Sequence, residues 1–496
     1  MIKKQKKTHV PTLPVMHPDE YELMANYFSN DFEEQIGFLK IMADEDKEPF
    51  LPLIKDISFL STIITDKQWA TYKTRLGLTQ TPRILMITSF TKTTYDLQDI
   101  LAATPYLKTL KFCDKFRRRS DLIEFEKIVY PPSLESLEFD KFSAVFDKQL
   151  AYLPLKKLTF GYYSNFIFSS VVLPRTLETL TFGHDFNQDI HCNQLSACFL
   201  KTLIFGDLFD KDLFHVVLPC TLETLKFGEK FNSPLNPFQL STTSLKTLVF
   251  GDQYNSESFS DLNLPSTLET LIFKREFNQF LRPTQLVNTS LITLIFGNNF
   301  NPFPKNFKFV VLPTSLKILD FGNTFNQKIL DDQLVNTSLE SLTFGSFFRN
   351  GQVGYTGASF ESVILPKSLK ELAIYSGLEL GKEQLLNTSL TVLKYGGMST
   401  SKFSNIKLPS TLDNLEFVRG FFDELEPCQF SNLRVKYLKF HSDYQKEILL
   451  EHLCKPDIAT FSLTLSKQYK VPVLFPSTRQ VSMYNGYNIQ VFNLTL

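Results

Sequence analysis

The chain has 496 residues, and its 52 Lys and Arg residues balance its 52 Asp and Glu residues. The zero net charge argues against nucleic acid as a partner, and a hydrophobic content of 43% argues against a chain that is disordered throughout. Six cysteines in so long a chain exclude a small disulfide scaffold, and 49 phenylalanines beside a single tryptophan indicate a structural position that uses Phe repeatedly.

The first segment, residues 1–14, is expected to be a disordered basic tail. It contains Lys3, Lys4, Lys6 and Lys7, and because no apolar run follows them it is not a secretory signal. A nuclear-import patch is the alternative reading of these lysines. No run in the chain approaches the ~18 apolar residues that a membrane-spanning helix needs. We therefore expect a cytoplasmic protein, or a nuclear one, with no membrane partner.

Residues 15–80 are expected to form a small helical N-terminal domain. Apolar residues recur there at helical spacing, first at Tyr21, Met24, Tyr27, Phe28, Phe32, Ile36 and Leu39, then at Trp69, Tyr72 and Leu76. Such a domain would cap the first coil of a repeat stack, whose uncovered end would expose its core. Leu13-Pro14 followed by short helices also resembles an F-box, which implies that residues 15–60 dock a ubiquitin-ligase adaptor. Both interpretations stay open at this stage.

The pattern Leu-x-x-Leu-x-Phe recurs through residues 81–440 at intervals of about 22–23 residues. Its first leucine falls at residues 107, 134, 155, 177, 200, 222, 245, 268, 291, 316, 339, 369, 390 and 412. Ile84-x-x-Ile87 is a candidate for a first, weak copy, and Val435-x-x-Leu438-x-Phe440 for a last one. The period lies in the leucine-rich-repeat range, so the pattern predicts a parallel β solenoid of about 15 coils with one strand per coil.

Two versions of the repeat alternate, so the true unit is a doublet of about 45 residues. One version enters its strand through Leu-Pro, as at Leu173-Pro174, and the other mostly through Asn-Thr-Ser-Leu, as at Asn288. After the strand comes Phe-Gly-x-x-Phe-Asn, as in Phe182-Gly-His-Asp-Phe186-Asn187. Copies between residues 345 and 404 are degenerate, with several motif residues replaced, and carry an insertion at 346–362.

These motifs resemble the FNIP repeat family, because Leu-Pro-x-Thr-Leu-Glu-Thr-Leu-x-Phe-Gly-x-x-Phe-Asn recurs in near-complete form over residues 107–440. The literal Phe-Asn-Ile-Pro tetrapeptide is missing; Phe231-Asn-Ser-Pro234 is its nearest version. The resemblance implies a leucine-rich-like solenoid with an interaction role, and it carries no catalytic residues to transfer.

Several recurring positions have a predicted structural role. The second Phe of each copy, as at Phe186 and Phe231, predicts a stacked aromatic spine inside the coils. The Asn that follows it predicts a ladder in which side chains satisfy backbone groups of the turns. The Gly after the strand, as at Gly183 and Gly322, predicts a turn with positive φ.

Three rows of residues are expected on the outward face of the strands. The residue after the first Leu alternates in sign from coil to coil, as in Glu178, Lys201 and Glu223, and is expected in the turn that enters the strand. The next residue is mostly Thr. The residue between the second Leu and Phe is polar in the outer coils, but in the central coils it reads Ile204, Lys226, Val249, Ile272 and Ile295.

An apolar cluster at outward positions of a polar sheet is a candidate partner-binding surface. The predicted binding residues are Ile204, Val249, Ile272, Ile292 and Ile295. Cover by another segment, or a simple preference of strands for β-branched residues, is the alternative explanation. The partner itself is unknown, and the sequence predicts an interaction scaffold.

The last segment, residues 441–496, is expected to be a C-terminal cap with a helix at Tyr444–Leu453 and strands at Val471–Phe475 and Ile489–Phe492. No phosphate-binding glycine loop or His-Glu-x-x-His motif is present, and His191-Cys192 with Cys198 lacks the second pair of a zinc site. We therefore predict no cofactor, no metal and no enzymatic activity.

Overall fold

The computed structural model describes residues 84–87, 97–98, 101–102, 104–112, 127–140, 148–304, 306–352, 358–397, 402–421, 423, 437–441, 460–464, 480–485 and 488–493. The chain divides into two compact units, Met1–Leu137 and Glu138–Leu496. The expected basic tail at 1–14 and the expected helical domain at 15–80, with its F-box alternative at 15–60, lie outside the described residues.

The described elements are short strands and 3₁₀ helices. The strands are β1 (Ile84–Ile87), β2 (Thr109–Phe112), β3 (Ser136–Phe139), β4 (Lys157–Thr159), β5 (Thr179–Thr181), β6 (Thr202–Ile204), β7 (Thr224–Lys226), β8 (Thr247–Val249), β9 (Thr270–Ile272), β10 (Thr293–Ile295), β11 (Ile318–Asp320), β12 (Ser341–Phe344), β13 (Ala358–Ser359), β14 (Glu371–Ile374), β15 (Leu378–Glu379), β16 (Val392–Tyr395), β17 (Asn414–Phe417), β18 (Tyr437–Phe440), β19 (Thr460–Thr464), β20 (Gln480–Asn485) and β21 (Asn488–Asn493). The 3₁₀ helices are η6 (Lys148–Tyr152), η7 (Glu257–Asp261), η8 (Phe307–Phe309) and η9 (Phe403–Asn405).

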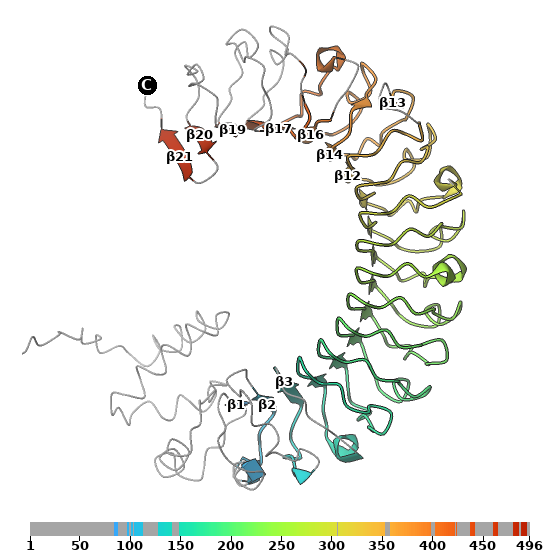
Figure 1. Cartoon of the computed structure of the whole chain (residues 1–496), viewed down its shortest axis with the longest axis vertical. Coiled ribbons are helices and arrows are strands. Elements are labelled where there is room, and N and C mark those ends of the chain that lie inside the picture. Colours follow the sequence, from blue (N-terminus) through green and yellow to red (C-terminus); the bar gives the residue numbers. More distant parts are fainter. Residues whose placement is uncertain are drawn as a thin grey trace, which may run out of the picture. The chain divides into compact units, whose positions relative to one another are not determined.

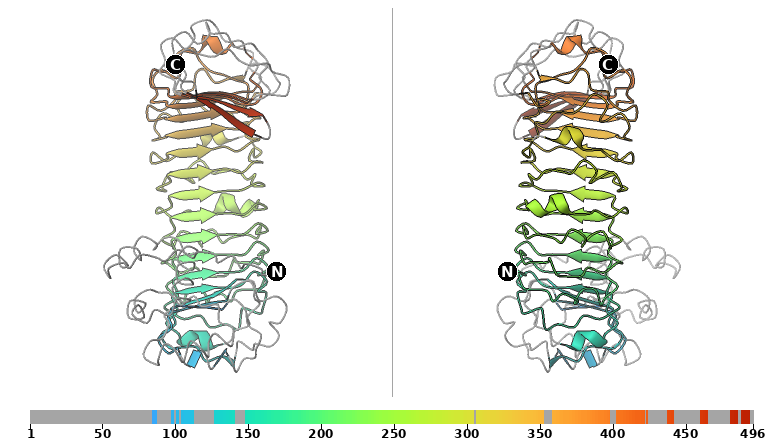
Figure 2. Two further views of the ribbon diagram at one scale, coloured as in Figure 1. Left: turned by 90° about the vertical axis from the view of Figure 1, so that its left-hand side faces the viewer. Right: turned by 90° about the vertical axis from the view of Figure 1, so that its right-hand side faces the viewer.

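The larger unit is a parallel β solenoid. From β4 to β12 each strand pairs in parallel with the next one in the chain, and β14, β16, β17, β18, β19 and β20 continue this ladder. Within this unit the strands line the inner side of the stack, and η7 and η8 lie on its outer side (Figures 1 and 2). The predicted fold class is confirmed.

The register aligns the second leucine of each repeat with that of the next, as for Leu158 and Leu180. The aligned leucines are 21 to 30 residues apart, and the longest step is the one across the insertion between β12 and β14. Register in the degenerate copies follows the same rule, because Leu342 pairs with Leu372 and Leu372 with Leu393. Part of the insertion forms β13, which pairs in parallel with β15 beside the main ladder.

The phenylalanines form two stacked spines in the core. The predicted spine runs through Phe186, Phe209, Phe231, Tyr254, Phe277, Phe300, Phe325 and Phe348, with ring centroids 5.7–6.2 Å apart and neighbouring rings within 14° of parallel. The strand phenylalanines form a second spine, as in Phe205, Phe227 and Phe250, and the two spines stack on each other within each coil, for example 3.9 Å apart for Phe227 and Phe231. All these rings are buried, which explains the high Phe content.

The asparagine ladder is confirmed. The Oδ1 atom of each ladder residue accepts a hydrogen bond from the backbone N–H of its counterpart in the next coil, at 2.7–3.1 Å, through Asn165, Asn187, Asp210, Asn232, Asn255, Asn278, Asn301 and Asn326. Asp210 replaces Asn without loss, because only the acceptor oxygen is used. The ladder therefore satisfies one turn N–H per coil.

The prediction of positive φ at the glycines after the strands is wrong for most copies. Gly322 has φ +69°, but Gly183, Gly206, Gly228, Gly251 and Gly297 do not adopt the left-handed region. These glycines are required for another reason, since a Cβ atom at Gly251 would lie 1.7 Å from the carbonyl oxygen of Gly228 in the preceding coil. At these glycines the backbone of the preceding coil leaves no room for a Cβ atom, whereas Lys274 occupies the equivalent position after β9.

Buried or half-buried glutamines join the coils in pairs. In each doublet the Nε2 atom of one glutamine donates hydrogen bonds of 2.7–3.2 Å to two backbone carbonyls of the preceding coil, as Gln285 does to Phe259 and Leu262; the series is Gln194, Gln239, Gln285, Gln333 and Gln384. Its Oε1 atom accepts from the backbone N–H three residues earlier. Within the described coils, only one of the two alternating versions of the repeat carries the clamping glutamine, and the clamp joins each coil of this version to the coil before it.

Register at the start of the chain differs from the expected one. In the smaller unit β1 pairs with β2 so that Ile84 aligns with Thr109 and Leu85 with Leu110. Ile84 therefore does not correspond to Leu107, and the first copy is shifted by two residues.

Three described strands fall within the expected C-terminal cap at 441–496. The strand expected at Ile489–Phe492 lies within β21, which pairs antiparallel with β20. The helix expected at Tyr444–Leu453 and the strand at Val471–Phe475 lie outside the described residues. The capping role itself stays a prediction.

Candidate functional site

The residue that precedes each strand forms the charge row on the inner side of the solenoid. Lys201 Nζ lies 2.8 Å from Glu178 and Lys246 Nζ 2.9 Å from Glu223. Glu340 binds Lys370 at 2.6 Å and Lys317 at 2.9 Å, and these two hydrogen bonds lower its pKa to about 2. The pairs are exposed and screened by solvent, so they add little to stability, and alternation of charge mainly disfavours a register slip that brings like charges together.

Ile292 interrupts the charge row. It lies between Glu269 and Lys317, and its side chain is 38% exposed. It therefore lies two rows away from the other predicted binding residues, just before the strand begins.

The first residue of each strand forms the hydroxyl row, which includes Thr179, Thr202, Thr224, Thr247, Thr270, Thr293 and Ser341. Ile318 interrupts this row between Thr293 and Ser341 and is 39% exposed. The sequence analysis missed Ile318, although its place before Leu319-Asp320-Phe321 in the repeat could have shown it.

The third residue of each strand forms the third row. Register places Ile204, Lys226, Val249, Ile272 and Ile295 side by side in consecutive coils. The four apolar side chains are partly exposed and Lys226 is exposed. Lys226 thus separates Ile204 from the continuous run of Val249, Ile272 and Ile295.

The two interruptions, Ile292 and Ile318, lie in adjoining coils. The backbone carbonyl of Ile292 accepts hydrogen bonds from the N–H groups of Lys317 and Ile318, both at 2.9 Å, so Ile292 and Ile318 lie in contacting coils. Ile295 lies two residues beyond Thr293, the register partner of Ile318. We call Val249, Ile272, Ile292, Ile295 and Ile318 the apolar patch. It spans β8 to β11 on a face whose other positions in β5 to β12 are mostly charged or hydroxylated, with Ile204 lying apart from it.

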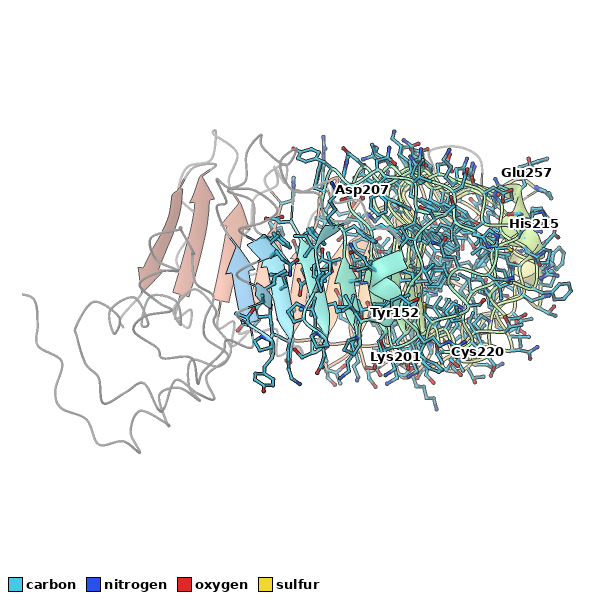
Figure 3. The ribbon with its side chains drawn as sticks, turned by 90° about the horizontal axis from the view of Figure 1, so that it is seen from below. Tyr152, Lys201, Asp207, His215, Cys220 and Glu257 are labelled. Atoms are coloured by element: carbon cyan, nitrogen blue, oxygen red, sulfur yellow. The ribbon has the colours of Figure 1, made fainter. Side chains whose placement is uncertain are left out.

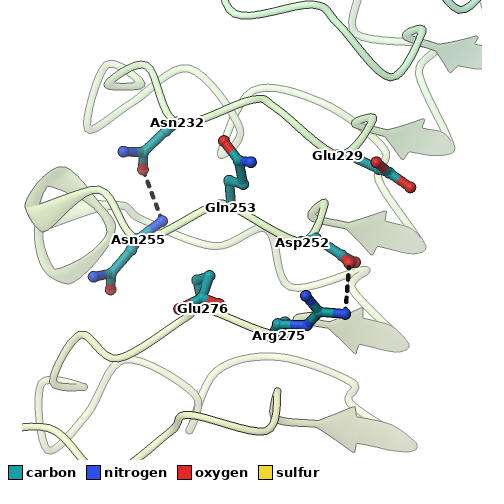
Figure 4. A pocket seen from close by; sticks show the side chains of 7 residues that line it. All are labelled: Glu229, Asn232, Asp252, Gln253, Asn255, Arg275 and Glu276. Carbon is teal, nitrogen blue, oxygen red and sulfur yellow. Dashed lines mark hydrogen bonds and ion pairs between the residues drawn. The ribbon is translucent and has the colours of Figure 1, made fainter.

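A second surface feature is a polar hollow in the loops that follow β7, β8 and β9. It has a volume of about 520 Å³ and is lined by Glu229, Asn232, Asp252, Gln253, Asn255, Arg275 and Glu276 (Figure 4). Asp252 pairs with Arg275 at 4.0 Å, and Asn232 and Asn255 belong to the asparagine ladder. The hollow is open, and its side chains largely bond to one another or to the repeat.

The described residues contain no group of three or more His, Cys, Asp and Glu side chains that could hold a metal ion. His191 and Cys192 lie 3.7 Å apart, whereas Cys198 is buried, and burial raises the pKa of its thiol to about 11. No helix in the described part of the chain is long and apolar enough to cross a bilayer.

Comparison with known proteins agrees with the repeat. The family model described as FNIP Repeat matches residues 186–230 and 303–347. The chain contains FNIP repeats. The first match begins at Phe186 of the aromatic spine, and the second begins three residues after Phe300 of the spine. Each match covers one doublet, so the FNIP unit of this chain corresponds to a pair of coils. A search of curated proteins found no match.

Two solved structures resemble the chain. One is CroV588, described as a novel circular LRR protein, with 24% identity, a TM-score of 0.46, and 82% of this chain and 70% of that chain covered. The other is TLR13 in a complex with ssRNA13, with 15% identity, a TM-score of 0.47, and 77% of this chain and 58% of that chain covered.

Proposed function

We propose that this FNIP-repeat chain is a non-enzymatic scaffold for protein–protein interaction and that a protein partner binds the apolar patch. The observation that carries the proposal is that two departures from the repeat, at Ile292 and Ile318, lie in two adjoining coils beside Ile295, the last residue of the apolar run in the third row. Charged and hydroxylated side chains occupy these two positions in most of the neighbouring coils, so the solenoid does not require exposed isoleucines there.

The surroundings of the patch suit a protein interface. Lys246, Glu269 and Lys317 flank it along the charge row and would supply a polar rim around an apolar centre. The rigid ladder beneath holds the isoleucines in place before binding, so little conformational entropy is lost on association.

A reaction centre has less support. Burial raises the pKa of the carboxyl groups of Asp320 and Asp423, but these two residues lie in different coils. Functional acids and bases are usually gathered in one cleft, and this pair is not.

The test is the double substitution Val249→Asp with Ile272→Asp, compared with Thr181→Asp and Thr343→Asp, which lie in the same row outside the patch. Partners would first be captured from the native cell with the unaltered chain, and one purified partner would then be titrated. We expect the patch variant to weaken binding at least about thirtyfold, as for an interface hot spot, and the control to bind normally.

Neighbouring aspartates could weaken the sheet itself, so a milder variant is needed as well. Ile318→Thr restores the hydroxyl row to the composition of the other coils and should leave stability unchanged. It should still reduce affinity. If the partner binds both variants as tightly as the unaltered chain, the patch is not its binding site.

A further inference from the structure

An exposed aromatic turn lies between β7 and β8. Asn236, Pro237 and Phe238 form it, and the carbonyl of Pro237 accepts a hydrogen bond of 2.8 Å from the N–H of Asn263, which lies just after η7. Glu257, the first residue of η7, lies on the outer side of the stack (Figure 3). The turn is thus remote from the inner face that carries the apolar patch.

Phe238 is exposed in a way that the repeat does not require. Its side chain is 66% exposed and stacks on no other ring in the described part of the chain. The residue before the clamping glutamine is polar in every other doublet that has one: Asn193, Thr284, Asp332 and Glu383. Single exposed apolar side chains are common on protein surfaces, so exposure alone does not mark a binding site. Phe238 is distinguished by the turn that holds it.

The turn is held in one conformation from both sides. Asn236 Oδ1 accepts from the N–H of Phe238 at 3.0 Å, which closes an Asx turn, and the proline ring fixes φ within it. The N–H of Asn236 donates to Gln239 Oε1 at 3.2 Å, and the N–H of Gln239 donates to the carbonyl of Asn236 at 3.0 Å. Such preorganisation lowers the entropic cost of binding.

A second ring belongs to the same clamped loops. Phe214 is 36% exposed, and its N–H donates to Asp212 Oδ1 at 2.7 Å. Gln239 Nε2 bonds the carbonyls of Leu213 and Val216, on either side of Phe214, at 2.7 Å each. The clamp therefore ties the loop that carries Phe214 to the turn that carries Phe238.

We propose that the Asn236-Pro237-Phe238 turn is a second protein-binding site, separate from the apolar patch. Its partner is a small protein domain with an apolar pocket that takes the Phe238 ring and with polar groups at the rim that bond to the peptide groups of an Asn-Pro-Phe turn. Aromatic side chains seated in such pockets commonly dominate the energy of an interface.

The chain offers its own matched control. Asn301-Pro302-Phe303 repeats the same three residues, and Phe303 is 89% exposed. However, Asn301 Oδ1 accepts from the N–H of Asn326 in the asparagine ladder at 3.1 Å, and no Asx turn forms around Phe303. The turn conformation, rather than the tripeptide alone, should decide binding.

In the experiment, a purified helical domain that binds isolated Asn-Pro-Phe peptides is titrated into the full-length chain, and calorimetry measures the heat of binding. We expect saturable binding, a loss of at least about thirtyfold with Phe238→Ala, and a smaller loss with Asn236→Ala, which removes the turn bond but keeps the ring. Phe303→Ala should bind normally, and so should Val249→Asp with Ile272→Asp, which separates this site from the apolar patch.

Three results would overturn the proposal. The first is no binding by the unaltered chain, and the second is equal loss with Phe238→Ala and Phe303→Ala, which would indicate unspecific apolar contact. The third is self-association of the chain alone that Phe238→Ala abolishes in sedimentation, since the occupant would then be a second copy. Circular dichroism of each variant would show that the solenoid is intact, as expected for changes at exposed side chains.

Discussion

At the scale of single residues, a glycine follows the strand phenylalanine in most coils, Lys274 being an exception after β9, and this glycine is needed for space. A Cβ atom added to this glycine would overlap backbone atoms of the neighbouring coil, and a backbone cannot move aside as the end of a side chain can. The same close approach brings the rings of the two spines to stacking distance in every coil. One residue type at one position therefore sets the spacing on which the aromatic core depends.

Gly251→Ala is expected to destabilise the solenoid by about 1–3 kcal/mol or more, because the added methyl group would lie 1.7 Å from the Gly228 oxygen. Thermal unfolding followed by circular dichroism measures the effect. Gly381→Ala is the control, since its new Cβ atom would have its nearest contact at 3.2 Å. Equal effects of the two substitutions would contradict the steric argument.

At the scale of elements, the coils are joined by two different side-chain bonds that alternate. Within a doublet the glutamine clamp crosses the interface; between doublets a hydroxyl group does, as Thr221 Oγ1 donates to the carbonyl of Leu200 and Thr267 Oγ1 to that of Leu245, both at 2.8 Å. The clamp satisfies two carbonyls in the interior and the hydroxyl satisfies one. Water cannot replace these bonds cheaply, so the interface within a doublet should open last.

Gln285→Leu removes both donors of one clamp and leaves the carbonyls of Phe259 and Leu262 without them. Leu262 keeps its bond from Arg282 Nη2, and Phe259 keeps its bond from the N–H of Leu262. The N–H of Arg282, however, loses its acceptor, Gln285 Oε1. A loss of about 1–3 kcal/mol is expected. Hydrogen exchange should report faster opening of the loop that contains η7, while distant doublets keep their protection. Gln253→Leu is the control at an exposed position outside the clamps, and it should change neither the free energy of unfolding nor the exchange rates. A loss of protection along the whole solenoid after Gln285→Leu would contradict a local clamp.

At the scale of the larger unit, the solenoid behaves as a one-dimensional array whose building block is the pair of coils. Each coil contacts its neighbours in the ladder, so stability should be a sum of doublet terms and interface terms. The FNIP matches cover two coils each, in agreement with this unit.

Deletion of residues 246–291 removes one complete doublet, including Gln285 and both its acceptors, and joins Leu245 to Ile292 in register. We expect the shortened chain to fold, with cooperative thermal unfolding close to that of the full chain. Deletion of residues 246–268 removes a single coil and leaves Gln285 without Phe259 and Leu262, so it should cost about 2 kcal/mol or more. If both deletions behave alike, the coil rather than the doublet is the unit.

The sequence by itself determined the solenoid, the aromatic spine, the asparagine ladder and the doublet period, because each depends on contacts between equivalent positions that repetition displays directly. It also located Val249, Ile272 and Ile295 in one row. The repeat also gives Ile318 a place in the hydroxyl row, but its contact with the coil of Ile292 follows from the register between β10 and β11.

Only the tertiary structure shows why three features are present: the glycines, the clamping glutamines and the Asn236-Pro237-Phe238 turn. The glycines recur at one position of the repeat because the coils contact each other there, and the glutamines bond carbonyls 21 to 26 residues away. The Asn236-Pro237-Phe238 turn differs from Asn301-Pro302-Phe303 in the group that donates to the Oδ1 atom of its asparagine. Each reason is a distance between atoms of different coils. A linear pattern gives the residue types that recur, but not the hydrogen-bond and steric partners that they meet across the stack.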